Sequence, residues 1–306
     1  MTTGHIPVLV QEVVAALGPR PDGLYLDCTV GGGGHAAAIL DAAGPPSRLV
    51  GVDRDPEAIA LARGALERFG DRVQLIQGDF RELPRLLSPL HLGRFDGMLF
   101  DLGVSSAQLA DPGRGFSFGM EGPLDMRMDR HGGGPTAREI LHALPEERLA
   151  RIIREYGEER WARQIARGIV NARHRGSLET TQDLATVVSR AIPRRLWPRR
   201  IHPATRTFQA IRIAVNQELE GLGEALEAAI GLLKAHGRIC VIAFHSLEDR
   251  VVKHLFRRLA APEAVAGVQI LTRRPVTPSV EEMARNPRAR SAKLRAAERR
   301  EEQRGA

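Results

Sequence analysis

The sequence predicts an α/β protein, in which a mostly parallel Rossmann-like sheet is interrupted by an all-helical insertion. Short apolar runs alternate with helical patterns up to Gly103, as expected of βαβ units whose sheet is covered on both faces. From Thr136 to about Pro193 every pattern is helical, and an apolar run at 237–246 then resumes the α/β rhythm.

The individual elements follow from local patterns. Strands are expected at 24–30, 48–53, 72–80 and 95–103, and a helix at 55–70, where Asp55 suits the N-cap and Pro56 the first turn. The Gly- and Pro-rich stretch 111–135 predicts an ordered loop, and 209–237 predicts a long helical stretch. An edge strand is expected at 271–279, and the charged tail 284–306 is expected to be partly disordered.

Composition narrows the classes of protein. The chain has 306 residues, of which 43% are hydrophobic, enough for one large domain or two modest ones. It has no apolar run of about 18 residues and no secretory leader pattern, so we expect a cytoplasmic protein without a membrane span. Cys28 and Cys240 lie in apolar runs and predict buried, reduced thiols. No zinc spacing is present, and we expect no metal.

Charge points to a polyanionic partner. The net charge is +7, which favours RNA or DNA, although the preference for Arg over Lys can also reflect genome composition. The position of the charge is therefore more informative than its sum. No acidic residue occurs between Asp183 and Glu218. The arginines of this window predict a phosphate-binding patch, or else a solvated face: Arg190, Arg194, Arg195, Arg199, Arg200, Arg206 and Arg212. The tail offers a second candidate cluster: Arg285, Arg288, Arg290 and Arg295.

A glycine loop, Gly31 to Gly34, joins the first predicted strand to a helix. Glycine lets backbone N–H groups approach a ligand closely, because no Cβ intervenes. Gly31, Gly33 and Ala36 match the dinucleotide pattern G-x-G-x-x-G/A, which is weak support by itself. The loop lacks the G-K-[ST] ending that a nucleoside triphosphate site requires.

Acidic residues end all four of the first predicted strands: Asp27, Asp53, Asp79 and Asp101. Ligands of open parallel sheets bind at these carboxyl ends. Asp53, twenty residues after Gly33, suits the ribose hydroxyls of either NAD or S-adenosylmethionine (AdoMet). Asp79 and Phe80 suit the edge and the face of an adenine, with core packing as the alternative for Phe80. Asp101 lies where the reacting group of the ligand would be. The pattern predicts an adenosine-type ligand and leaves both cofactors open.

Longer motifs resemble those of the ribosomal RNA small-subunit methyltransferase H family, the MraW-like 16S rRNA cytosine-N4 methyltransferases. They span nearly the whole chain: HIPVLVQEV (5–13), GGGGH (31–35), DRDPEAI (53–59), DLGVSSAQL (101–109), RGFSF (114–118), PLDMRMD (123–129), EERWARQIARGIV (158–170), HPATRTFQAIRIAVNQEL (202–219), FHSLEDRVVK (244–253) and NPRARSAKLR (286–295). One local departure is Ala36, where Ser or Thr is frequent in the family.

The resemblance implies a class I AdoMet-dependent methyltransferase. Its core would comprise 1–107 and 210–306, and the insertion 108–209 would recognise the substrate RNA. The implied AdoMet contacts are Gly33, Gly34, His35, Asp53, Phe80, Asp101 and Gln108. The implied product is N4-methylcytidine at the decoding centre of 16S rRNA, in the small ribosomal subunit or its precursor. The oligomeric state is left open, a homodimer included.

The sequence identifies the catalytic residue less definitely than it identifies the cofactor-binding residues. Asp101 is the candidate acceptor for an N4 hydrogen, with backbone carbonyls of 102–105 as alternatives, and a purely cofactor-binding role for Asp101 is open. Phe116, Phe118 and Trp197 are candidate partners for an unstacked base, or else core residues. Two rival functions stand beside the methyltransferase: an NAD-dependent oxidoreductase and a non-catalytic RNA-binding assembly factor.

Overall fold

The computed structural model describes residues 7–262, 264 and 267–301, so His5 of the first motif lies outside the described part. The chain forms two compact units. The core unit comprises Met1–Gly103 and Leu219–Ala306, and the helical unit comprises Val104–Glu218. The sequence placed these borders after residues 107 and 209, four and nine residues from those of the structure.

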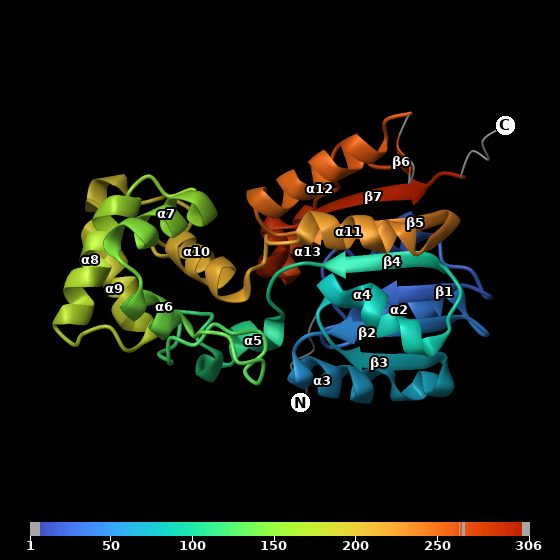
Figure 1. Cartoon of the computed structure of the whole chain (residues 1–306), viewed down its shortest axis with the longest axis horizontal. Coiled ribbons are helices and arrows are strands. Elements are labelled where there is room, and N and C mark those ends of the chain that lie inside the picture. The colour runs from blue at the N-terminus through green and yellow to red at the C-terminus, as the bar shows by residue number, and fades with distance from the viewer. Residues whose placement is uncertain (1–6, 263, 265–266, 302–306) are drawn as a thin grey trace. The chain divides into compact units, whose positions relative to one another are not determined.

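A seven-stranded sheet in the order β3-β2-β1-β4-β5-β7-β6 forms the centre of the core unit (Figure 1). The strands are β1 (Leu24–Asp27), β2 (Arg48–Asp53), β3 (Val73–Gln77), β4 (Phe95–Asp101), β5 (Leu233–Ala243), β6 (Val268–Ile270) and β7 (Lys293–Arg299). The pairs from β3 to β5 are parallel, whereas β7 runs antiparallel to both of its neighbours. The predicted α/β class with a mostly parallel sheet is confirmed.

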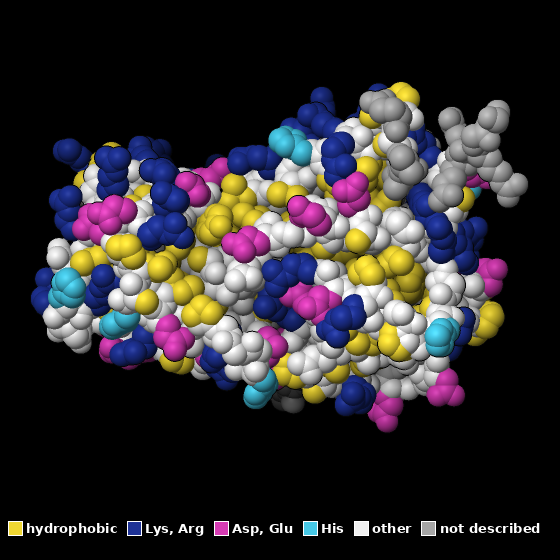
Figure 2. Space-filling model, viewed as in Figure 1, with side chains coloured by type: hydrophobic (Ala, Val, Ile, Leu, Met, Phe, Trp, Pro, Cys, Tyr) yellow, Lys and Arg dark blue, Asp and Glu magenta, His cyan; other side chains and the backbone are white. Residues whose placement is uncertain are grey.

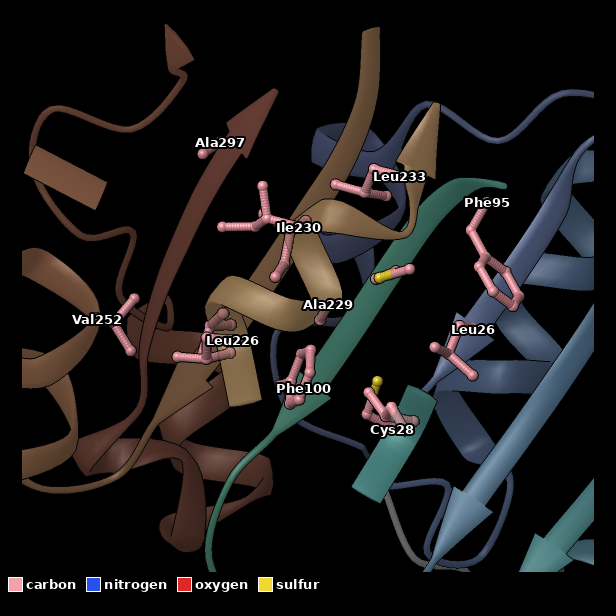
Figure 3. Packing of buried hydrophobic residues seen from close by; sticks show 14 of the residues in the cluster. Leu26, Cys28, Phe95, Phe100, Leu226, Ala229, Ile230, Leu233, Val252 and Ala297 are labelled. Carbon is pink, nitrogen blue, oxygen red and sulfur yellow. The ribbon is translucent and has the colours of Figure 1, made fainter. Parts of the chain in front are cut away.

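Helices cover both faces of this sheet. They are α1 (Val10–Leu17), α2 (Gly34–Ala43), α3 (Pro56–Leu66), α4 (Leu83–Leu87), α11 (Leu222–Gly231), α12 (Ser246–Leu259) and α13 (Val280–Arg285). Side chains alternate along each strand, so Leu26 packs towards α4, α11 and α12, while Tyr25 packs towards α1, α2 and α3. Figure 3 shows the first of these clusters, with Phe100 on β4, Leu226 on α11 and Val252 on α12. Cys28 and Cys240 are both buried, as predicted.

The long helical stretch expected at 209–237 is wrong in its continuity. The structure has α10 (Thr205–Asn216) and α11, separated at Gln217 and Gly221, which adopt left-handed φ angles of 52° and 70°. A left-handed residue ends one helix because it turns the chain away from the helix axis. β5 also begins at Leu233, within the stretch that was predicted to be helical.

From residue 284 to residue 301 the tail is ordered, so the predicted partial disorder is wrong there, and residues 302–306 lie outside the described part. β7 lies inside the sheet between β5 and β6, and Leu294, Ala296 and Ala297 are buried. The intervening arginines are satisfied: Arg295 donates to Asp249 Oδ1 at 2.6 Å, and Arg299 donates to the carbonyl of Gly231 at 3.1 Å. Burial of a charged group is tolerated when such partners replace water. The edge strand is β6, at 268–270 rather than 271–279, where only Val276 forms an isolated bridge to Leu294.

The helical unit contains α5 (Ser106–Ala110), α6 (Ala137–Ala143), α7 (Glu146–Gly157), α8 (Ala162–His174), α9 (Thr181–Ala191) and α10. All of its residues are described, and none forms a β-strand. Capping boxes start α6 at Thr136 and α9 at Thr180. The loop 111–135 is ordered as predicted: the buried Arg114 donates to the carbonyl of Met128 at 2.7 Å, and Asn216 binds the backbone of Met126 and Met128. Among the described residues of the whole chain, no helix has the length and apolarity of a membrane span.

Candidate active site

The glycine loop forms a backbone cradle at the start of α2. Gly31 and Gly33 have left-handed φ angles of 52° and 82°, which side-chain-bearing residues rarely adopt. A Cβ added to Gly34 would lie 2.5 Å from Cγ of Pro7, whereas one added to Gly32 would meet nothing within 4 Å. The N–H groups in the first turn of a helix lack intrahelical partners and carry partial positive charge. Gly34 and His35 present such groups, as a ligand carboxylate would require.

Asp53, at the end of β2, fixes this loop. Its Oδ2 accepts the Gly31 N–H at 2.9 Å and its Oδ1 accepts the Asp55 N–H at 2.9 Å. Burial raises the pKa of Asp53 to about 6, although these two hydrogen bonds act to lower it. A carboxylate has about four lone-pair positions, so two remain for ribose hydroxyls.

Two carboxyl groups and an imidazole meet beside the loop. Asp27 is 1% exposed and His35 is 6% exposed. His35 Nε2 lies 2.8 Å from the Val8 carbonyl, and its Nδ1 lies 3.6 Å from Asp101 Oδ2. Burial lowers the pKa of His35, so the ring is neutral near pH 7 and its contact with Asp101 is not an ion pair. Burial also raises the pKa values of Asp27 and Asp101 to about 7 each.

Asp101 has an unmet hydrogen-bonding capacity. Its backbone N–H donates to Thr29 Oγ1 at 2.6 Å, which ties the end of β4 to the loop after β1. Its Oδ1 atom is buried without a hydrogen-bond partner among the described residues, although the side chain is 21% exposed overall. An orphaned carboxylate oxygen beside a second buried acid favours a cationic or hydrogen-donating ligand, because either would stabilise the ionised form.

The end of β3 is organised differently from the other strand ends. Arg81 donates to both oxygens of Asp79, at 3.0 and 2.6 Å. Burial alone would raise the pKa of Asp79, but the bonds from Arg81 outweigh it and the pKa is lowered. Asp79 therefore orders the strand end and is less free for an adenine edge than the sequence suggested. Phe80 packs edge-on against Phe100, with ring centroids 5.6 Å apart, and stays only partly buried.

Gln108 lies in the helical unit, at the start of α5. Its side-chain oxygen accepts the Ser105 N–H at 2.9 Å as part of a capping box, and the residue is buried. The cofactor contact that the resemblance implies for Gln108 stays a prediction.

The predicted arginine patch is exposed. Arg194, Arg195, Arg199 and Arg200 have no ion-pair partner among the described residues, and Arg206 has one distant partner, Glu159, at 4.0 Å. Arg212, in the same window, is instead held by Glu218 at 2.7 Å. In the tail cluster, Arg295 is buried against Asp249, while Arg285, Arg288 and Arg290 are exposed.

A hollow in the helical unit adjoins this patch. It has a volume of about 470 Å³, and its lining includes Phe118, Trp197, His202, Arg190 and Arg194. The rings of Phe118 and His202 lie 4.7 Å apart between centroids. Phe116 is buried in the core of the unit, so its ring is not available to a base.

Sequence reasoning missed two supporting residues. Thr29 Oγ1 accepts the Asp101 N–H at 2.6 Å, and its position two residues after Asp27 was the available signal. Arg81 follows Asp79 by two residues, a spacing too common to single it out before the fold was known.

Comparison with known proteins places these features in one family. The family model described as "MraW methylase family" matches residues 2–300. The ribosomal RNA small subunit methyltransferase H of Geobacter sulfurreducens is 53% identical over 310 residues, covering 97% of this chain and 99% of its own. Its counterpart in Trichlorobacter lovleyi is 53% identical and covers 96% and 97%, respectively. That of Thermomicrobium roseum is 50% identical and covers 98% and 94%.

Proposed function

The chain belongs to the MraW methylase family, and from this premise we propose that it methylates N4 of a cytosine in 16S rRNA, using AdoMet as donor. The observation that carries the proposal is the group of buried acids, Asp27 and Asp101, beside a glycine cradle at the carboxyl ends of β1 and β4. Their raised pKa values suit a ligand with net positive charge, as AdoMet has, whereas NAD⁺ and NADH are net negative because of their two phosphates.

The residues of the core unit fit the parts of AdoMet. The first-turn N–H groups of Gly34 and His35 suit its carboxylate, Asp53 suits its ribose hydroxyls, and Phe80 suits its adenine. Bound AdoMet would supply a methyl group on a sulfonium that leaves as a neutral sulfide, so no acid is needed. The chain must therefore position the cytosine and accept a hydrogen from N4.

We assign Asp101 as the acceptor for a hydrogen on N4 of cytosine, the atom that attacks the methyl group. The N4 lone pair is delocalised into the ring, and an acceptor that holds an N4 hydrogen favours the pyramidal amine. The buried Oδ1 of Asp101 has no partner in the described structure and is available for this hydrogen. The ionised form is the competent acceptor, and orientation of the amine contributes further, up to roughly 7–11 kcal/mol in well-oriented reactions.

The helical unit supplies the RNA-binding surface in this proposal. Arg194, Arg195, Arg199 and Arg200 carry uncompensated charge for phosphates. The adjoining hollow offers Phe118, Trp197 and His202 as stacking partners for an unpaired base. The partner would be the small ribosomal subunit or its precursor in the cytoplasm. A homodimer stays a prediction, which sedimentation analysis would test.

Methyl transfer from labelled AdoMet to small subunits that lack the modification tests the function. We expect one labelled nucleoside, N4-methylcytidine, at the decoding centre, as identified by mass spectrometry. Label on another base or atom would contradict the specificity. Binding of rRNA and AdoMet without transfer would favour the assembly factor, and calorimetric binding of NADH in place of AdoMet would favour the oxidoreductase.

A further inference from the structure

A second basic groove lies on the core unit, at the edge where α12 meets β6 and β7. It has a volume of about 810 Å³. Six cationic side chains line it: Lys253, Arg257, Arg273, Arg274, Arg295 and Arg300. None of the described lining residues is acidic. Lys and Arg side chains lie over α12 in Figure 2.

The floor of the groove is fixed by internal contacts. Arg295 is bound by Asp249 Oδ1 at 2.6 Å, and Lys293 lies 3.4 Å from Oδ2 of the same carboxylate. Burial alone would raise the pKa of Asp249, but its bonds with Arg295 and Lys293 lower it, so the acid stays ionised and neutralises Arg295. Arg300 donates to the carbonyls of Leu259 and Ala261, at 3.4 and 2.7 Å, and keeps its charge because carbonyls are neutral.

The rim carries the free charge. Lys253 and Arg257 lie on α12, and Arg273 and Arg274 lie on the loop after β6. None of these four has a hydrogen-bond or ion-pair partner among the described residues, and the three arginines are exposed. Two pairs of cations that face each other across a groove repel each other. An anion bound between them offsets this repulsion. Thr272 and Gln269 add neutral hydrogen-bonding groups to the lining.

We propose that this groove binds the sugar–phosphate backbone of the rRNA substrate. Phe256, the aromatic residue in its lining, is 2% exposed, so the groove offers charge and no stacking platform. That chemistry suits a sugar–phosphate backbone without base readout. The inference rests on the proposed function, because it assumes an rRNA substrate, and it assigns to the core unit a share of RNA binding.

Reversal of the loop pair, R273E/R274E, tests the groove. The matched control is R48E/R63E, which changes two exposed arginines of β2 and α3 by the same total charge. We expect the loop variant to weaken binding of protein-free 16S rRNA and to lower its salt slope by about 1.4 to 1.8, for two lost phosphate contacts. The control should change the rRNA affinity and its salt slope only as far as the lower net charge of the whole protein requires. AdoMet affinity should be unchanged in both variants.

Other outcomes separate the groove from the function. If R273E/R274E matched the control in affinity and slope, the groove inference would fail while the function stood. If the variant lost binding to whole small subunits but kept binding to protein-free 16S rRNA, the groove would contact a ribosomal protein and the inference would be wrong. A wild type that neither binds nor methylates rRNA would overturn the proposed function itself. The pair K253Q/R257Q removes two charges on the α12 side of the groove. It should lower the salt slope by the same amount if the loop variant does not fold.

Discussion

Asp27, Asp53 and Asp101 are acids whose pKa values burial raises to about 7, 6 and 7, respectively. In water each would be ionised above about pH 4. Without a ligand, the folded core unit keeps Asp27 and Asp101 partly protonated at neutral pH. Ionisation of these acids therefore costs free energy in the ligand-free site, and a bound cation lowers that cost.

This cost makes AdoMet binding depend on pH. The neutral acids predominate at pH 5.5 and the anions at pH 7.5, so affinity should rise with pH across that range, by about tenfold. Calorimetric titration at several pH values measures the change. D27N should reduce the dependence without abolishing it, because Asp101 still titrates. A wild-type profile independent of pH would show that neither acid faces the cofactor.

Replacing Asp101 separates binding from catalysis. D101N keeps the shape of the side chain but weakens the acceptor at Oδ1, so we expect a fall in kcat of about 10²- to 10⁴-fold. AdoMet affinity at pH 7.5 should change by only a few-fold. If the affinity collapsed while the rate at saturating AdoMet survived, Asp101 would be a cofactor contact alone.

Alanine substitutions at two glycines of the loop, Gly32 and Gly34, should differ in their effect on stability. In G34A the new Cβ meets Pro7 at 2.5 Å, and relieving that contact should cost about 1–3 kcal/mol of unfolding free energy. G32A is the matched control, because a Cβ there meets nothing within 4 Å. Urea denaturation compares the two. Equal losses would mean that the approach of Pro7 to α2 is not a constraint.

Among the elements, β7 is where local pattern and tertiary structure disagree most. Its sequence, KLRAAER, has four charged residues among seven and lies in a stretch dominated by arginine. The sheet buries it because Asp249 satisfies Arg295 and backbone carbonyls satisfy Arg299. No local signal shows those partners, which lie 46 and 68 residues away along the chain.

A core substitution in β7 tests this placement. Leu294 is fully buried, so L294A should lower the free energy of unfolding by about 2–5 kcal/mol. V280A, at a side chain that is 73% exposed, should change it by no more than about 0.5 kcal/mol. Thermal or urea unfolding measures both. A cost for L294A as small as for V280A would contradict the buried strand.

For the first four strands and α3, in contrast to β7, local sequence pattern and tertiary structure agree. Their near-continuous apolar runs, the Asp55 cap and the Pro56 start are local, and the structure places each element within a few residues of its prediction. The sequence pattern at 209–237 did not show where α10 and α11 end and β5 begins, because Ala, Leu and Ile suit either a helix or a buried strand. Only the tertiary structure shows this division.

For the whole molecule, positive charge lies on two separate surfaces, the patch around Arg199 on the helical unit and the groove of the core unit. R199E/R200E should weaken 16S rRNA binding and lower the salt slope by about 1.4 to 1.8, measured by filter binding against the R48E/R63E control. Unchanged affinity and slope would remove the patch from the interface. If both surfaces bind one RNA independently, combining this variant with R273E/R274E should add the two losses in free energy.

By itself, the sequence determined the α/β class, the interrupted chain order, the glycine loop and the acids at the strand ends, because these depend on local periodicity and on fixed positions after strands. Its motifs also indicated the family. Only the tertiary structure decided which acids are free, since Arg81 occupies Asp79 whereas Asp101 keeps an orphaned oxygen. It also placed β7 in the sheet and opened the groove beside α12. Those outcomes depend on partners that are distant in sequence, whose burial and charge balance exist only in the folded chain.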